Sequence, residues 1–267
     1  MSARTRRATA IAAVVVFVCS VFPVYWMVNT AFLPGSAVKS ETPHFWPDQF
    51  TLQSFRAAWD GGFMPALWVS LAVTVLTVAA ALVFAFLAAI AVSRYRFRSR
   101  KSFIVAILVI QMIPAEAMII STFRVLDGWH LLNTVIGLSA VYIAMVLPFT
   151  IWTLRGFVNG IPADLEEAAM IDGCSRAQAF WRVTFPLLAP GLVSTGIFAF
   201  VFALVIMTRP EMETLPIWLR SFVQATKATD WAVVMAGSTL MAIPVIIFFL
   251  IVQGKMTSGL VSGAVKG

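Results

Sequence analysis

Charged side chains are scarce in this 267-residue chain. Asp, Glu, Lys and Arg make up 12% of the residues, whereas hydrophobic residues make up 60% and the mean hydropathy is +0.91. A soluble domain of this size carries roughly a quarter charged residues, enough to cover a water-facing surface. The composition therefore predicts that lipid is the solvent for most of the chain.

Cysteine and histidine are also rare. Cys19 falls in an apolar run and Cys174 in a charged loop, so their spacing predicts neither a disulfide framework nor a metal site. His44 and His130 each lack a second ligand at a useful spacing, and we expect both to be loop residues. No metal site is predicted.

Sequence patterns for catalysis and nucleotide binding are missing as well. The chain has no Gly-x-x-x-x-Gly-Lys-Ser/Thr phosphate loop, no Gly-x-Ser-x-Gly elbow and no His-Glu-x-x-His pair. Paired carboxylates within the apolar runs are absent too. We expect no catalytic residue and no cofactor on this chain, so any ATP and Mg²⁺ that it uses must be bound by another subunit.

Long apolar runs, by contrast, are plentiful. A membrane-spanning helix needs about 20 mostly apolar residues, and these runs are continuous rather than alternating, which favours helices over a barrel. The first run follows Arg4, Arg6 and Arg7 and is too long for a signal peptide. The sequence predicts an all-α, polytopic membrane protein with six transmembrane helices, at about Ala8–Phe32, Leu67–Ser93, Phe103–Phe123, Asn133–Leu154, Leu187–Met207 and Trp231–Gln253.

Basic residues indicate how these helices are oriented. With the N-terminus inside, about thirteen Lys and Arg residues fall in the cytoplasmic segments and about six outside, as the positive-inside rule requires. The cluster from Arg94 to Lys101 is the strongest marker. We therefore predict a multi-pass protein with both termini cytoplasmic. The net charge of +7 fits this topology. The sequence has no basic patch interleaved with aromatics, so nucleic-acid binding is not predicted.

The segment between the fourth and fifth predicted spans, residues 158–186, departs from the membrane pattern. Pro162 suits a first helical turn, and Gly173 permits a left-handed turn that ends the helix. A second amphipathic stretch covers residues 175–183. The positive end of the first helix is matched by acidic residues at Asp164, Glu166 and Glu167. The sequence thus predicts a helix-turn-helix on the cytoplasmic face.

Two interpretations of this segment are open. It can be a solvated connector between two spans. Alternatively, the small side chains of Ala168 and Ala169 allow another surface to approach closely, while neighbouring carboxylates attract Arg or Lys on that surface. A loop of this kind can transmit a rigid-body push between subunits.

The same segment resembles the Glu-Ala-Ala loop of binding-protein-dependent ABC importer permeases. That pattern has Glu-Ala-Ala, then Asp-Gly, then an aliphatic residue and a Pro, and here Glu167-Ala168-Ala169, Asp172-Gly173, Val183 and Pro186 stand at those places. Other stretches are similar to the carbohydrate branch, whose nearest type is the smaller permease of maltose-like and trehalose-like importers. They are residues 23–26 together with Asn29, and residues 94–97, 131–134, 214–218 and 258–267.

The resemblance implies a single permease domain over residues 1–267, with the type I importer fold and a coupling loop at about 158–186. It also implies a cytoplasmic membrane location in a bacterium, a sugar as substrate, and a non-enzymatic role. The implied partners are a second, similar permease, two ATP-binding subunits and an extracytoplasmic sugar-binding protein. The residues implied in coupling to the ATPase are Glu166, Glu167, Ala168, Ala169, Asp172, Gly173 and Pro186.

The fifth span departs from the family pattern. This branch commonly carries Trp-Asn and then an acid there, but the stretch 197–204 runs through without them. A helix over residues 187–207 would be roughly 31 Å long, just enough to cross the bilayer. Polar residues near the apolar runs, which either line the substrate path or serve a structural role, are Glu116, Gln111 and Asn29.

Several alternatives remain. Within transport, the substrate can be a polyol, glycerol phosphate or an oligosaccharide, although a charged substrate would want Lys or Arg at membrane depth. A self-sufficient channel or secondary carrier would need no ATPase and no role for the loop. An intramembrane enzyme is disfavoured by the missing catalytic pairs. The sequence does not specify which sugar is carried.

Overall fold

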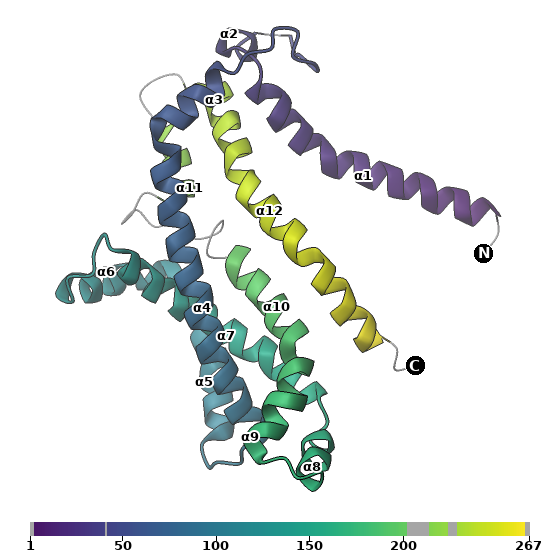
Figure 1. The fold of residues 1–267 in the computed structure, drawn as a ribbon. Coiled ribbons are helices and arrows are strands. Elements are labelled where there is room, and N and C mark those ends of the chain that lie inside the picture. Colours follow the sequence, from purple (N-terminus) through teal and green to yellow (C-terminus); the bar gives the residue numbers. More distant parts are fainter. Residues whose placement is uncertain (1–2, 41, 202–213, 224–228, 265–267) are drawn as a thin grey trace. The chain divides into compact units, whose positions relative to one another are not determined.

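The computed structural model describes residues 3–40, 42–201, 214–223 and 229–264, and within these ranges the regular structure is helical throughout. The chain divides into two compact units. Unit 1 holds residues 1–67 and 215–246, and unit 2 holds residues 68–214 and 247–267. Figure 1 shows the helices that make up both units.

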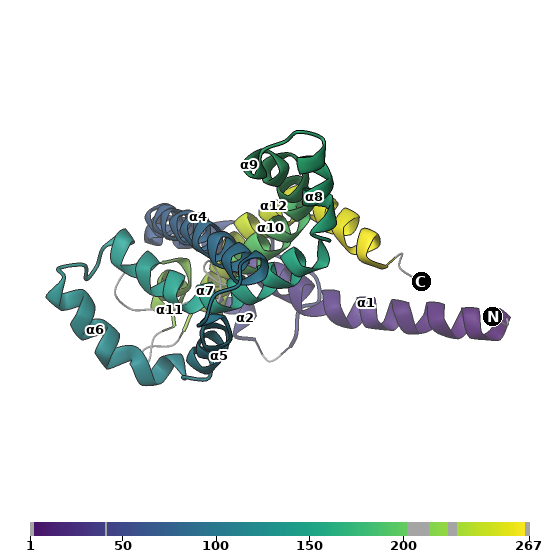
Figure 2. The same ribbon diagram turned by 90° about the horizontal axis from the view of Figure 1, so that it is seen from below.

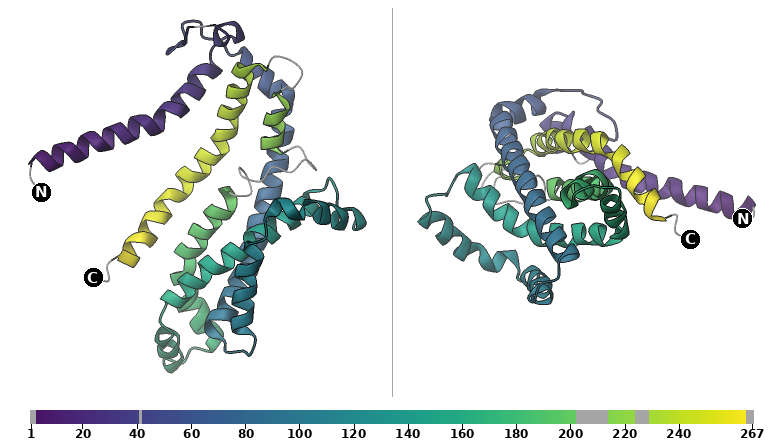
Figure 3. Two further views of the ribbon diagram at one scale, coloured as in Figure 1. Left: turned by 180° about the vertical axis from the view of Figure 1, so that it is seen from behind. Right: turned by 60° about the horizontal axis from the view of Figure 1, so that its bottom comes forward.

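Unit 1 is built from helices at the two ends of the chain. Its elements are α1 (Ala3–Ala31), α2 (Gly35–Val38), α3 (Gln53–Ala58), the π-turn η1 (Trp59–Phe63), the start of α4 (Met64–Arg94), α11 (Leu215–Ser221) and the first part of α12 (Trp231–Ala264). The indole nitrogen of Trp218 on α11 donates to the carbonyl oxygen of Gly61 at 2.9 Å. Trp218 also packs against Phe63 and lies close to Gly237 of α12. α11 is therefore held by both η1 and α12 (Figure 3).

Unit 2 contains the rest of the helices. Its elements are the remainder of α4, α5 (Arg100–Gln111), the 3-10 turn η2 (Ala115–Met118), α6 (Ile119–Gly128), α7 (Val135–Gly160), α8 (Asp164–Ile171), α9 (Arg176–Ala179), the π-turn η3 (Phe180–Thr184), α10 (Phe185–Val201) and the end of α12. One core cluster joins Ala85 and Ala89 of α4 to Leu154 and Val158 of α7 and Leu188 of α10. The small alanine side chains let the three helices approach closely, so their ends are fixed relative to one another.

Five helices of the described chain are long and apolar enough to cross a membrane. They are Thr5–Ala31, Gln53–Arg94, Val135–Gly160, Arg176–Val201 and Trp231–Ile251. The predicted helical class is thereby confirmed, and five of the six predicted spans correspond to these helices. Part of the fifth predicted span, residues 202–207, lies outside the described residues.

The third predicted span, Phe103–Phe123, is wrong as one continuous helix. α5 ends at Gln111, and the chain resumes as η2 and then α6, which runs in a different direction (Figure 2). The cause is Pro114, which has no backbone N–H and which disfavours helical geometry at Ile113 before it. The apolar composition of the run predicted a helix, but one proline within it divides the helix in two.

Candidate functional site

Residues 161–184 form a helical hairpin at the ends of α4 and α7, which we call the connecting hairpin (Figure 1). α8 ends in a reversed turn in which Gly173 has φ +92°. The amide of Cys174 donates to the Ala169 carbonyl at 3.0 Å, and that of Gly173 donates to the Met170 carbonyl at 3.1 Å. These are the two bonds of a Schellman motif, so the predicted helix stop at Gly173 is confirmed.

The next helix begins with equally complete capping. The Ser175 hydroxyl accepts from the Gln178 amide at 3.3 Å, and the Gln178 side-chain oxygen accepts from the Ser175 amide at 2.9 Å. This reciprocal pair is a capping box. The turn between α8 and α9 is thus closed by its own backbone and side chains, and the predicted helix-turn-helix is confirmed. Pro162, expected in the first turn, instead lies two residues before α8 begins.

One face of α8 points away from the rest of the unit. Asp164, Glu167, Ala168 and Ile171 are all exposed, and they recur at the i, i+3, i+4, i+7 spacing that places residues on a single helix face. Ile171 is 86% exposed, the highest fraction among the large hydrophobic residues that the structure describes. This outward face combines two carboxylates, one small residue and one apolar residue.

The opposite face of α8 is bound to the spans behind it. Glu166 Oε1 lies 3.2 Å from Nε of Arg94, the last residue of α4, and it accepts a 2.6 Å hydrogen bond from the Thr184 hydroxyl. The Arg94 Nη2 donates to the Ile161 carbonyl at 3.0 Å. The side chains of Arg94 and Glu166 are only 19% and 17% exposed. Two adjacent glutamates thus have different surroundings, because Glu166 faces the protein and Glu167 faces solvent.

Ring contacts add to this attachment. The guanidinium of Arg176 lies 6.0 Å from the centre of the Tyr95 ring, just beyond α4. Phe86 of α4 packs against Phe180 and Phe185, with ring centres 5.9 and 5.8 Å apart. The hairpin is therefore packed against the end of α4 as well as being joined in sequence to α7 and α10.

The remaining residues predicted for coupling lie on α8, in the turn after α8, and in α10. Ala169 is half-buried, whereas Asp172 and Gly173 are exposed at the turn. Pro186 is exposed in the first turn of α10, directly after the π-turn η3. Proline has no N–H to donate to the preceding turn, and this accounts for the wider π-turn η3 before it. The roles predicted for these residues stay predictions.

Sequence reasoning missed three residues of this site. Arg94 served as a marker of topology and as part of the resemblance over residues 94–97, but it received no role in coupling, and Thr184 and Ile171 received no role at all. The i+4 relation of Ile171 to Glu167 was available from the sequence and indicates a shared face. The contacts of Arg94 and Thr184 with Glu166 were not available, because they join segments that are distant in the chain.

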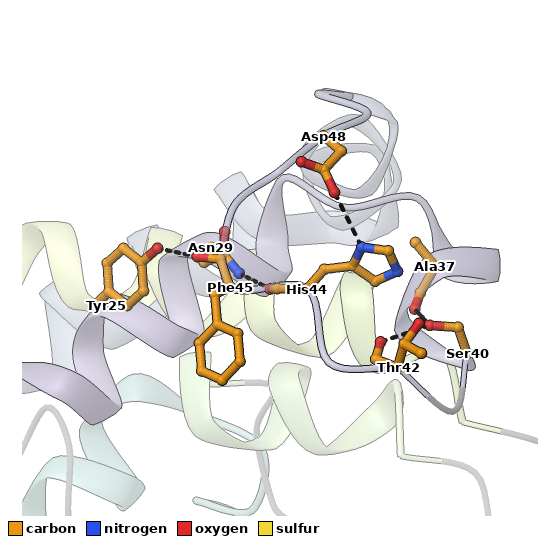
Figure 4. Close-up of polar contacts among 8 residues, drawn as sticks. All are labelled: Tyr25, Asn29, Ala37, Ser40, Thr42, His44, Phe45 and Asp48. Atoms are coloured by element: carbon orange, nitrogen blue, oxygen red, sulfur yellow. Dashed lines mark hydrogen bonds and ion pairs between the residues drawn. The ribbon is translucent and has the colours of Figure 1, made fainter.

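The three residues predicted for the substrate path belong to three different elements. Asn29 is only 4% exposed, and its side-chain nitrogen donates to the His44 carbonyl at 2.8 Å, as Figure 4 shows. This contact supports the structural alternative for Asn29. Gln111 is exposed at the end of α5. Glu116 lies in η2, but its side chain is outside what the structure describes.

Comparison with known proteins identifies the class to which this arrangement belongs. Residues 81–262 match the family of binding-protein-dependent transport system inner membrane components. The diacetylchitobiose uptake system permease protein DasC of Streptomyces coelicolor is 46% identical over 96% of both chains. The trehalose transport system permease protein SugB of Mycobacterium tuberculosis is 34% identical over 93% of both.

A solved structure agrees on the fold. The chain is similar to a bacterial ABC transporter involved in the import of the acidic polysaccharide alginate, with a TM-score of 0.77 and 23% identity over 95% of this chain and 98% of that one. The chain therefore belongs to the binding-protein-dependent transport system inner membrane components. It is a membrane permease subunit of an ABC transporter, a class of subunit that is not itself an enzyme.

Proposed function

We propose that this chain is a permease subunit of an ATP-driven importer that carries a sugar across the cytoplasmic membrane of a bacterium. Its similarity to permeases named for diacetylchitobiose and trehalose supports a substrate of one or a few sugar units. ATP and Mg²⁺ are bound by separate subunits. The full importer contains a second, similar permease, two ATP-binding subunits and an extracytoplasmic sugar-binding protein, and both termini of this chain face the cytoplasm.

The outward face of α8 is the surface on which we place the ATP-binding subunit. The observation that carries this proposal is the exposure of Ile171 at the end of a face that also presents Glu167 and Asp164. A groove that covers Ile171 removes its apolar surface from water, and basic groups around that groove pair with the two carboxylates. Ala168 lets the two backbones approach closely.

Alternating access follows from this placement. When the ATP-binding subunits close, they push on α8, and the hairpin passes that movement to the spans on which it packs. No bond of the substrate is made or broken in this chain. The energy for transport comes from the partner subunits.

The test uses the whole importer, in lipid vesicles, with the sugar-binding protein added. Glu167→Ala and Ile171→Gln are compared with Leu165→Gln, which replaces another exposed apolar residue of α8 that lies off the outward face. We expect the first two variants to lose most ATP-dependent uptake and to retain less ATPase on purification. The Leu165 variant should resemble the wild type.

The substrate is tested by uptake of diacetylchitobiose, trehalose and glycerol phosphate under the same conditions. Uptake of either sugar supports the proposal, and uptake of glycerol phosphate alone contradicts the sugar assignment. If uptake proceeds without any ATPase, or if Glu167→Ala and Ile171→Gln both behave as wild type, the connecting hairpin is only a connector.

A further inference from the structure

Three elements meet at a single carboxylate oxygen of α8. Glu166 Oε1 contacts Arg94 at the end of α4 and accepts from Thr184, the last residue of η3, directly before α10. The same arginine donates to the carbonyl of Ile161, just after α7. Glu166 itself belongs to α8. The group therefore connects the helix with the outward face to three helices of the core. We call Arg94, Glu166 and Thr184 the brace.

The brace is not needed to close the hairpin. The Schellman motif at Gly173 and the capping box at Ser175 satisfy the backbone of the turn locally. The brace instead fixes where the finished hairpin stands relative to α4 and α10. Arg94 contacts two different segments, because its Nη2 donates to the Ile161 carbonyl after α7 and its Nε lies 3.2 Å from Glu166 Oε1 of α8. The second contact is an ion pair without a hydrogen bond, and a rotation of α8 against the end of α4 would break it.

Burial makes these contacts costlier to break than those of a surface ion pair. Arg94 and Glu166 are less than one fifth exposed, and Thr184 is buried. Removing one partner of a shielded pair leaves the other charge uncompensated, whereas breaking an exposed pair costs little. The two glutamates thus have different roles. Glu166 attaches α8 to the helices behind it, and Glu167 faces outward.

We propose that the brace transmits the movement of α8 to α4 and α10, and that Arg94, Glu166 and Thr184 are positioning residues for coupling ATP hydrolysis to transport. This inference rests on the proposed function. A push on the outward face then moves α8, α4 and α10 together. Without the brace, the hairpin yields and hydrolysis proceeds with less transport.

The experiment measures sugar imported per ATP hydrolysed by the whole importer in vesicles, together with the ATPase retained on purification. The variants are Arg94→Ala, Arg94→Lys, Thr184→Val and Thr184→Ser. The control is Arg98→Ala, which removes the same charge from an exposed position in the same basic cluster. The probe is whichever of diacetylchitobiose or trehalose the wild type imports.

We expect Arg94→Ala to retain its ATPase while its sugar-to-ATP ratio falls about tenfold, a typical coupling factor between two sites. Lysine keeps the charge but not the fork, so Arg94→Lys should recover only part of the ratio. Thr184→Val should lower the ratio by a smaller factor, and Thr184→Ser, which keeps the hydroxyl, should restore it. Arg98→Ala should match the wild type.

Two results would overturn the brace. One is an unchanged ratio in Arg94→Lys and Thr184→Val. The other is a loss of bound ATPase in proportion to the loss of uptake, because that pattern belongs to a purely structural role. If Arg94→Ala does not reach the membrane, the two Thr184 variants decide the question. A wild-type importer that imports neither sugar with ATP refutes the proposed function instead.

Discussion

Two connectors in this chain are attached in contrasting ways. The connecting hairpin of unit 2 is tied through Glu166 and Arg94 to several helices at once. In unit 1, two carbonyls of the segment between α1 and α3 accept from α1, where Tyr25 donates to the Phe45 carbonyl and Asn29 to the His44 carbonyl (Figure 4). Phe32 at the start of the same segment packs against Phe55 of α3. A connector tied by side chains to helices that are distant in the chain can pass movement among them, whereas one held to its neighbours in sequence moves with those neighbours.

The largest effect should come from the turn of the hairpin itself. Gly173 has φ +92°, a conformation that costs a residue with a side chain roughly 1–2 kcal/mol, and more strain for a β-branched one. Gly173→Val should therefore displace α8 and reduce uptake by about tenfold. The readouts are uptake in vesicles and the rate of protease cleavage between α8 and α9.

Gly160→Ala is the matched control for this variant. Gly160 ends α7, its φ is not positive, and an added Cβ would meet nothing within 4 Å. Near-normal uptake is expected. Equal losses in the two glycine variants would mean that the left-handed turn has no special part in coupling.

A smaller and different effect is expected for Asn29→Ala. This change removes the side-chain hydrogen bond to His44 and leaves the carbonyl without that donor, at a cost of about 1 kcal/mol. Protease should cleave residues 39–52 faster, while the sugar-to-ATP ratio should stay near that of the wild type. Ser36→Ala, at an exposed position of α2, is the control. A fall in the ratio as large as that of Arg94→Ala would remove the contrast between the two connectors.

The smallest effect is expected at the exposed pair in the same segment. His44 Nδ1 lies 3.3 Å from Asp48 Oδ2, but the Asp48 side chain is 72% exposed. Exposed pairs of this kind contribute little to stability. Asp48→Asn should leave both protease cleavage and uptake unchanged within error. A cleavage rate as high as that of Asn29→Ala would show that this pair holds the segment more firmly than its exposure suggests.

Much of the fold could be predicted, because membrane-spanning helices are recognisable in a sequence by the length and apolar composition of their runs. The apolar runs of α1, α4, α7 and α12 lie close to their predicted positions. The break at Pro114 was visible in the sequence, but the apolar character of the whole run outweighed one residue. Residues that end or begin a helix were better predictors in the hairpin than in this run. Gly173 ends one helix there, and Ser175 caps the next.

The candidate site was predictable only in part. The sequence places Glu166 and Glu167 together and gives both the same role. Separating them requires the position of Arg94, which approaches α8 only when α4, α7 and α10 pack. Contacts between distant segments depend on this packing, and no local pattern encodes them.

The interruption between α5 and α6 also limits where this part of the chain can lie in a bilayer. A helix end presents backbone carbonyls without helical partners, and hydrocarbon offers them none. The stretch 112–114 must then lie at the level of the lipid headgroups, beside a hydrated space, or against other protein that supplies hydrogen-bond partners. In every case lipid tails are kept from the backbone that directly follows Gln111, the last residue of α5.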